Sequence, residues 1–156
     1  IIPLVETYNS ILDMHNIVKI SGVKEIYIGL NDLHIDMGMK FMFEPLAIGM
    51  IDEAVKIIKE SRLPFGFGGV ARVGEGHIPG ELILAEHDRL GSSSVILSRT
   101  FHRGNDILQS SQKNTSFQDE LKKLNDQLYK LKQRDKNKIL KDHIEFRELV
   151  YKIFNN

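Results

Sequence analysis

The sequence has no cysteine, no net charge and no long apolar run. Without cysteine, the chain has no disulfide framework, no thiolate zinc site and no thiol catalysis, and we expect it to work in the cytoplasm. Its 21 basic and 21 acidic residues cancel, which predicts no bulk attraction to nucleic acid or to an anionic membrane. No stretch approaches the roughly 18 apolar residues of a membrane span. We therefore expect neither nucleic acid nor a membrane as a partner.

What is present is the composition of one ordinary globular domain. The chain has 156 residues, of which 42% are hydrophobic and 27% are charged. It opens at Ile1, without methionine and directly in a strand-like run. We therefore expect it to be the remainder of a longer protein.

Strand-like and helix-like runs alternate up to about residue 103, a pattern typical of βαβ units around a parallel sheet. Helices are predicted from about 8 to 19, from about 45 to 58, and between Pro79 and Gly91, where proline opens and glycine ends the helix. Four parallel strands make half of an eight-stranded barrel or a small open sheet. The predicted strands are Ile2–Val5, Glu25–Gly29, Pro64–Gly68 and Ser94–Ser98.

The composition changes after residue 103. Residues 104–115 are polar, as in a linker, and Ser116 with Asp119 forms a capping-box pattern that opens a helix. A second helix is predicted after Asp135. We expect 116–156 to be a helical extension whose charged positions form a solvated face. The apolar seam of its first helix is Phe117, Leu121, Leu124, Leu128 and Leu131, and the face of its second helix is Ile139, Leu140, Ile144, Leu149, Val150 and Ile153.

Two carboxylates end neighbouring strand-like runs. Glu6 follows the first run and Asp32 follows the second, so both are expected at the carboxyl ends of adjacent parallel strands, where α/β barrels build their active sites. Carboxylate oxygens suit Mg²⁺ or Mn²⁺. The alternative is that each acid simply caps the following helix.

The glycine-rich segment from 66 to 76 permits three readings. Gly66-x-Gly68-x-x-Ala71, with Asp88 beyond it, matches a dinucleotide fingerprint, but the helix that should begin inside the glycines is delayed to Pro79. As the end of a barrel strand, the segment would let a ligand approach the backbone, with Arg72 available for an anion. It can also be a flexible loop with a surface arginine.

A family resemblance rests on several motifs in order. Val5-Glu6-Thr7, the segment from Ile26 to Leu33 with Met37-Gly38, the segment from Gly66 to Ala71, and Ser94 to Leu97 resemble the class II aldolase and citrate lyase family of the phosphoenolpyruvate/pyruvate superfamily. The resemblance covers about residues 1–103. It implies a (β/α)₈ TIM barrel of which this chain is the C-terminal half, strands five to eight, followed by the C-terminal helices.

The resemblance also implies a site. Glu6 and Asp32 would bind one Mg²⁺ or Mn²⁺ as ligands and not as bases, and the amides around Asn31 and Asp32 would hold the carboxylate of a pyruvate-type 2-oxo acid. No catalytic residue is assigned in this half, because in the family the proton is moved by a metal-bound water, or by a histidine with an arginine from the N-terminal half, which is missing here. The expected substrate-binding positions are Gly29, Asn31, Asp32, Gly68 and Arg72.

The expected activity is cleavage or formation of a carbon–carbon bond through an enolate, which a metal stabilises as a Lewis acid. We expect the N-terminal half of the barrel and further copies of the chain as partners. His34, placed by the sequence on the loop after Asp32, is a further candidate ligand or a solvent-facing residue. Leu30, Asn31 and His34 stand where Pro, Ala and Ser are frequent in the family, which leaves the aldehyde or acyl partner open.

Two other functions fit the same residues. One is an acyl-CoA lyase of the citryl or malyl type. The other is a non-catalytic, barrel-derived assembly module in which the seam from Leu121 to Leu131 provides the contact.

Overall fold

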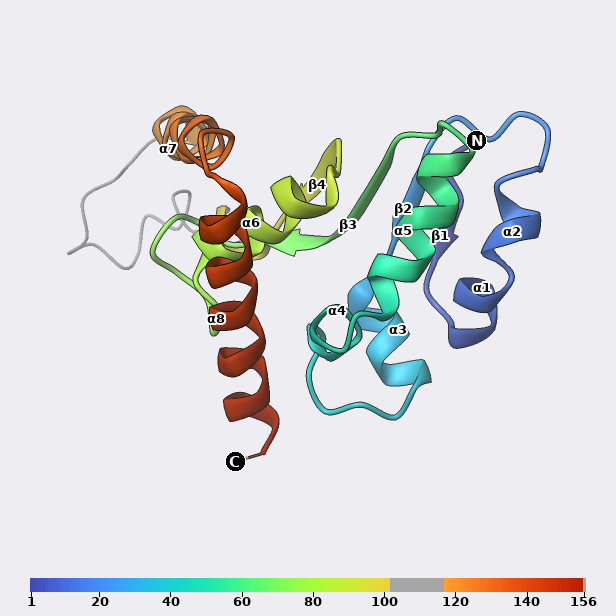
Figure 1. The fold of residues 1–156 in the computed structure, drawn as a ribbon, viewed down its shortest axis with the longest axis horizontal. Coiled ribbons are helices and arrows are strands. Elements are labelled where there is room, and N and C mark those ends of the chain that lie inside the picture. The colour runs from blue at the N-terminus through green and yellow to red at the C-terminus, as the bar shows by residue number, and fades with distance from the viewer. Residues whose placement is uncertain (102–116, 156) are drawn as a thin grey trace, which may run out of the picture.

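The computed structural model describes residues 1–101 and 117–155, which form an α/β structure (Figure 1). Its strands are β1 (Leu4–Val5), β2 (Ile26–Ile28), β3 (Phe65–Val70) and β4 (Ser94–Leu97). Its helices are α1 (Tyr8–Leu12), α2 (Met14–Ile17), α3 (Leu30–Asp36), α4 (Glu44–Ala47), α5 (Met50–Glu60), α6 (Gly80–Leu90), α7 (Phe117–Leu131) and α8 (Lys136–Phe154).

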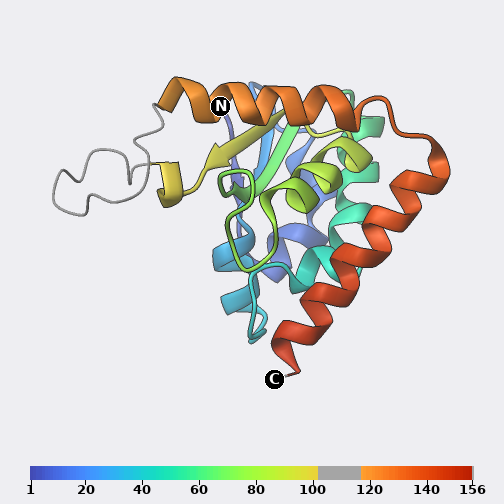
Figure 2. The same ribbon diagram turned by 90° about the vertical axis from the view of Figure 1, so that its left-hand side faces the viewer.

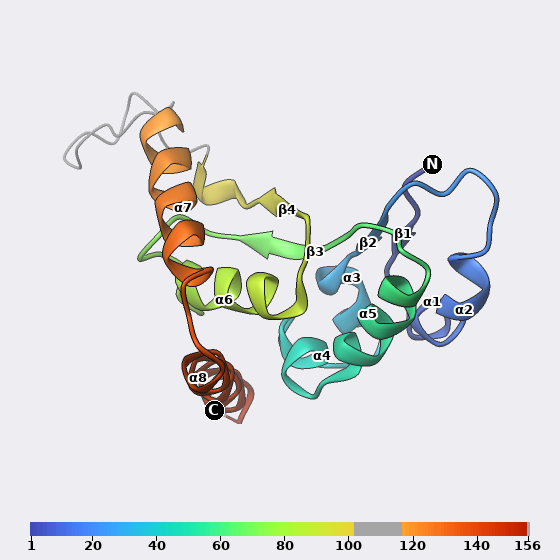
Figure 3. The ribbon, with the colours of Figure 1, turned by 45° about the horizontal axis from the view of Figure 1, so that its top comes forward.

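The four strands form one parallel sheet in the order β1-β2-β3-β4. Strand order therefore follows chain order, with no reversal point. Figure 3 shows α1, α2, α5 and α6 on one side of this sheet. Within the described residues the opposite face carries no helix, and β1 and β4 are its unpaired edges. The predicted α/β class and parallel sheet are confirmed.

Alternation along the strands decides which residues are buried under the helices. Ile26 and Ile28 of β2 and Phe65 and Phe67 of β3 point toward the helices and are almost completely buried. They pack with the apolar faces of α5 and α6 in one continuous core. Residues at the intervening positions, such as Leu4, Tyr27 and Ile96, lie on the other face of the sheet.

Two of the predicted helices are broken. The helix predicted from 8 to 19 is two short helices, because Asp13 ends α1 with a non-helical backbone and begins α2. The helix predicted from about 45 to 58 is also two helices. Gly49 separates α4 from α5 with a φ of 83°, a left-handed conformation that ends a helix.

The residues after Asp32 do not form the predicted loop but α3. Leu30 and Leu33, three positions apart, bury one face of this short helix. The strand boundaries also differ, since β1 is shorter than Ile2–Val5 and β3 runs on to Val70, past the predicted end at Gly68.

The dinucleotide reading is wrong. Gly66 and Gly68 lie inside β3, and α6 begins only at Gly80, so no helix N-terminus lies beneath these glycines. The sequential strand order also lacks the topological switch point at which doubly wound sheets bind nucleotides.

The C-terminal helices pack against the outer side of α6, and α8 also contacts α4 (Figure 2). The expectation of a solvated charged face is wrong in part, because Glu120 and Asp142 are buried. Phe117, predicted in the apolar seam of α7, is exposed, and so are Leu140 and Ile144, predicted on the apolar face of α8. Ser116 and the predicted linker 104–115 lie outside the described residues. In the described ranges, no helix has both the length and the apolarity needed to cross a membrane.

A buried polar network fixes α8 to α6. The Glu86 carboxylate, 1% exposed, accepts hydrogen bonds from Arg89 at 2.8 and 3.0 Å and lies 3.0 Å from Nδ1 of His143 on α8. Arg89 also pairs with Asp52 of α5 at 2.5 Å. Polar side chains from three helices, α5, α6 and α8, therefore meet in one network.

Candidate functional site

Glu6 and Asp32 lie next to each other at the carboxyl edge of the sheet. Glu6 directly follows β1, and Asp32 lies in the first turn of α3, which follows β2. The amide of Gly29 donates to the carbonyl of Val5 at 2.9 Å and joins the two strand ends. Partial burial raises the pKa of Glu6, and so do the negative charge of Asp32 and a hydrogen bond that protonated Glu6 donates to Asp32.

Gly29 makes room for the Glu6 side chain. A Cβ atom at Gly29 would lie 2.7 Å from both Cγ and Oε1 of Glu6, closer than such atoms can approach. The carboxylate of Glu6 therefore lies over the end of β2. Asp32 lies in α3, the helix that follows this strand. Gly29, expected at the substrate, is thus in contact with an expected metal ligand.

A second acid of α3 positions the loop that carries Glu6. Asp36 lies four residues after Asp32, and residues at this spacing share a helix face. Its Oδ2 accepts a hydrogen bond of 2.7 Å from the backbone amide of Tyr8, the first residue of α1. Thr7 caps the same helix through a capping box with Ser10. The connection from β1 to α1 is therefore fixed to the helix face that carries Asp32.

The amides around Asn31 and Asp32 belong to the first turn of α3. The first intrahelical bond runs from the amide of Leu33 to the carbonyl of Gly29 at 3.0 Å. The amides of Leu30, Asn31 and Asp32 therefore come before the first hydrogen bond within the helix, as the first amides of any helix do. The side chains of Asn31 and Asp32 are exposed.

Gly68 and Arg72 lie on the next strand connection. Gly68 has a φ of 50°, and a Cβ there would lie 2.9 Å from Cδ1 of Leu30. The Arg72 guanidinium donates to the carbonyl of Phe101 at 3.3 Å and lies 6.0 Å from the centre of its ring. Arg72 is therefore directed toward the β4 side. Its predicted contact with an anionic substrate stays a prediction.

His34 is not placed to join the two carboxylates. It lies in α3 two residues after Asp32, and positions two apart on a helix point to different sides. Its Nδ1 atom is buried without a hydrogen-bond partner in the described part of the chain. Because the segment is a helix and not the predicted loop, His34 and Asp32 point to different sides, which argues against their sharing one metal ion.

The geometry suits a divalent cation held by two oxygen ligands. Two carboxylates that face each other repel, and a cation between them removes that repulsion, which is the chemistry that Mg²⁺ and Mn²⁺ sites use. Across residues 1–101 and 117–155, no group of three or more His, Asp or Glu side chains is arranged to hold a metal. Further ligands to a cation at this pair would therefore come from outside these described side chains, for example from substrate or water.

Two positioning residues were missed by the sequence reading, Asp36 and Tyr27. The spacing of Asp32 and Asp36 signals a shared helix face, but only once the segment is recognised as a helix. The Tyr27 hydroxyl donates to the carbonyl of Gly68 at 2.5 Å and accepts from the amide of Ile96 at 2.9 Å. It lies where the register between β3 and β4 shifts, and nothing in the sequence signals that contact.

Comparison of the chain with protein-family models, with curated proteins and with solved structures gave no match.

Proposed function

We propose that this chain is the metal-binding half of a metal-dependent carbon–carbon lyase or aldolase that acts on a 2-oxo acid. The observation that carries the proposal is the pair formed by Glu6 and Asp32. Glu6 and Asp32 follow adjacent parallel strands and lie together at the carboxyl edge of the sheet, where burial first, and then the negative charge of Asp32, raises the pKa of Glu6.

The architecture supports a half-barrel origin. A barrel of alternating strands and helices has sequential strand order, parallel strands and all its helices outside. The sheet order β1-β2-β3-β4, with the crossover helices on one face, has this winding. The other four strands would come from an N-terminal half of the parent protein, together with the arginine and the proton-transferring histidine.

Each residue of this chain has a limited role in the proposed reaction. Glu6 and Asp32 would hold Mg²⁺ or Mn²⁺, which stabilises the enolate as a Lewis acid when bound. The first-turn amides of Asn31 and Asp32 would orient the substrate carboxylate. Gly29 keeps Glu6 in place and Asp36 keeps the β1–α1 connection in place.

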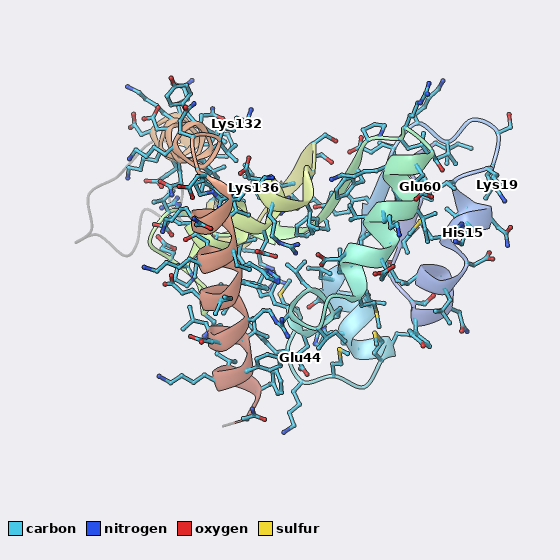
Figure 4. The ribbon with its side chains drawn as sticks, viewed as in Figure 1. His15, Lys19, Glu44, Glu60, Lys132 and Lys136 are labelled. Carbon is cyan, nitrogen blue, oxygen red and sulfur yellow. The ribbon has the colours of Figure 1, made fainter. Side chains whose placement is uncertain are left out.

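Calorimetric titration of the full chain with Mg²⁺ or Mn²⁺ alone tests the ligand assignment. We expect one site per chain, and we expect Glu6→Gln and Asp32→Asn each to weaken binding at least tenfold. Glu60→Gln is the matched control, because Glu60 is an exposed acid at the far end of α5 (Figure 4). Unchanged affinity in both site variants would remove these residues from the proposed site.

A coupled assay with lactate dehydrogenase tests the reaction. The proposed parent protein should release pyruvate from 4-hydroxy-2-oxo acids when Mg²⁺ or Mn²⁺ is present, and chelator should stop it. This chain alone should not turn over, because the groups of a catalytic site do not act additively. Release of acyl-CoA products instead would favour the citryl or malyl type of lyase. Absence of metal binding would favour the assembly module.

A further inference from the structure

We propose that the uncovered face of the sheet and its two edge strands bind a second copy of this chain, so that two four-stranded sheets close one eight-stranded barrel. The proposal rests on the half-barrel part of the proposed function and is independent of its metal chemistry. In this dimer, a second copy occupies the place that the N-terminal half occupies in the proposed parent protein.

The two edges of the sheet are complementary to each other. β1 and β4 both run parallel to their neighbours, and in the described residues neither has a partner on its outer side. If β4 of one copy pairs with β1 of the other, the parallel order continues. A twofold axis along the barrel then repeats the same contact on the opposite side. One kind of contact therefore covers all four open edges, which are otherwise a site of uncontrolled association.

The exposed apolar residues of the uncovered face are on these same two strands. Leu4 of β1 is 54% exposed and Ile96 of β4 is 57% exposed, whereas Tyr27 between them is buried. Closing the barrel places the inward side chains of β4 beside those of the partner's β1. The interior of an eight-stranded barrel is just wide enough to be filled by such side chains. The apolar surface that needs cover is therefore where the second copy would lie.

Two properties of the chain favour a second copy as the occupant. Its formal charge is zero, so two copies do not repel each other at long range. To continue the barrel, the strand that pairs with each edge must be parallel to it and must be connected to helices on the outer face. The chain itself offers both, since helices α1 and α2 follow β1 and α6 precedes β4.

Because the chain has no cysteine, engineered disulfides can test the contact directly. Leu4→Cys is combined in turn with Ser94→Cys and Ile96→Cys, which are alternate positions of β4, and with Ser98→Cys just beyond its end. Within one copy the two edges are three strand spacings apart, about 14 Å, which is too far for a disulfide. We expect at least one pair to oxidise to a covalent dimer. Each single variant, and Leu12→Cys with Ile96→Cys, should not form that closed dimer, since Leu12 lies on the helical side.

Sedimentation of the full chain gives the second readout. We expect a dimer, which Leu4→Lys or Ile96→Lys converts to a folded monomer, with circular dichroism as the check on folding. Ile35→Lys is the control, because Ile35 is 62% exposed but lies on α3. A monomeric unsubstituted chain would overturn the proposal and leave the N-terminal half as the occupant. Disulfide-linked ladders longer than a dimer would also overturn it.

The two proposals can fail separately. Glu6→Gln should weaken metal binding at least tenfold in calorimetry while the chain still sediments as a dimer. A dimer without metal binding would contradict only the proposed chemistry, and metal binding by a monomer would contradict only the closed barrel.

Discussion

The side chain of Glu6 lies against the backbone of Gly29, and there is no room for a methyl group between them. The three nearest atoms to a Cβ at Gly29 all belong to Glu6, and two of them would be only 2.7 Å away. The φ of Gly29 is −84°, which any L-residue adopts. This glycine is therefore required by the contact with Glu6 and not by the backbone.

Gly29→Ala should weaken metal binding with little loss of stability. The atoms in the way are the outer atoms of a partly exposed Glu6 side chain, which can move aside. We expect Mg²⁺ or Mn²⁺ affinity to fall about tenfold or more, and the free energy of unfolding to change by less than about 1 kcal/mol. Gly38→Ala should show the reverse, because Gly38 has a φ of 66° and nothing within 4 Å of an added Cβ. Calorimetry and urea denaturation of both variants measure the contrast.

Glu6→Gln should stabilise the metal-free chain near neutral pH. The folded state raises the pKa of Glu6, so ionising this carboxyl costs more in the folded than in the unfolded chain. That cost is absent below the ordinary Glu pKa of 4.5 and is complete above the raised pKa. The midpoint of thermal unfolding in chelator should therefore rise in the variant at pH 7 and match the unsubstituted chain near pH 4. A variant less stable than the unsubstituted chain at pH 7 would contradict a cost of ionising Glu6 in the folded state.

His87 should make the chain less stable in acid. Its ring stacks on Phe67 at 3.8 Å, and burial lowers its pKa from 6.5 to about 3. Below pH 6.5 the unfolded chain takes up a proton that the folded chain refuses until about pH 3. The free energy of unfolding should therefore fall by up to about 1.4 kcal/mol per pH unit from this residue. Urea denaturation of the unsubstituted chain and of His87→Gln between pH 7 and pH 4.5 measures it, and equal slopes would refute it.

Glu86→Ala should loosen α8. The substitution removes the acceptor that Arg89 and His143 share, and it leaves polar groups buried between α6 and α8. We expect the free energy of unfolding to fall by about 2–4 kcal/mol. Hydrogen exchange should show the amides of α8 opening first. Glu148→Gln is the control on the exposed side of α8, and it should change neither quantity.

The sequence was sufficient to predict the alternating strands and helices and their parallel order, because apolar periodicity and the Pro79 and Gly91 boundaries are local signals. It was not sufficient to predict where helices break. Asp13 and Gly49 end helices through backbone conformations that the surrounding apolar spacing does not reveal. The helix α3 was missed because its seven residues carry only a brief apolar pattern.

The candidate site and the charged network of α8 were likewise predictable from the sequence only in part. That Glu6 and Asp32 come together follows from adjacency of parallel strands, which the sequence reading used. The contacts of Asp36 with Tyr8 and of Glu86 with His143 do not follow from any local pattern. The partner of Glu86 is 57 residues away in the chain, so its burial depends on where α8 packs. Tertiary packing therefore decides which charged residues are solvated and which are not.

The hydroxyl of Tyr27 has a consequence for the order in which the sheet assembles. It lies between two strands to which it does not belong, since it bonds the carbonyl of Gly68 on β3 and the amide of Ile96 on β4. The register shift between β3 and β4 is held by a side chain from β2. Parallel pairing of β3 with β4 alone lacks the Tyr27 contacts, so native alignment of β4 requires β2 to be in place already. Folding of this sheet should consequently proceed from its N-terminal strands outward, and β4 should be the last strand to gain protection from hydrogen exchange during refolding.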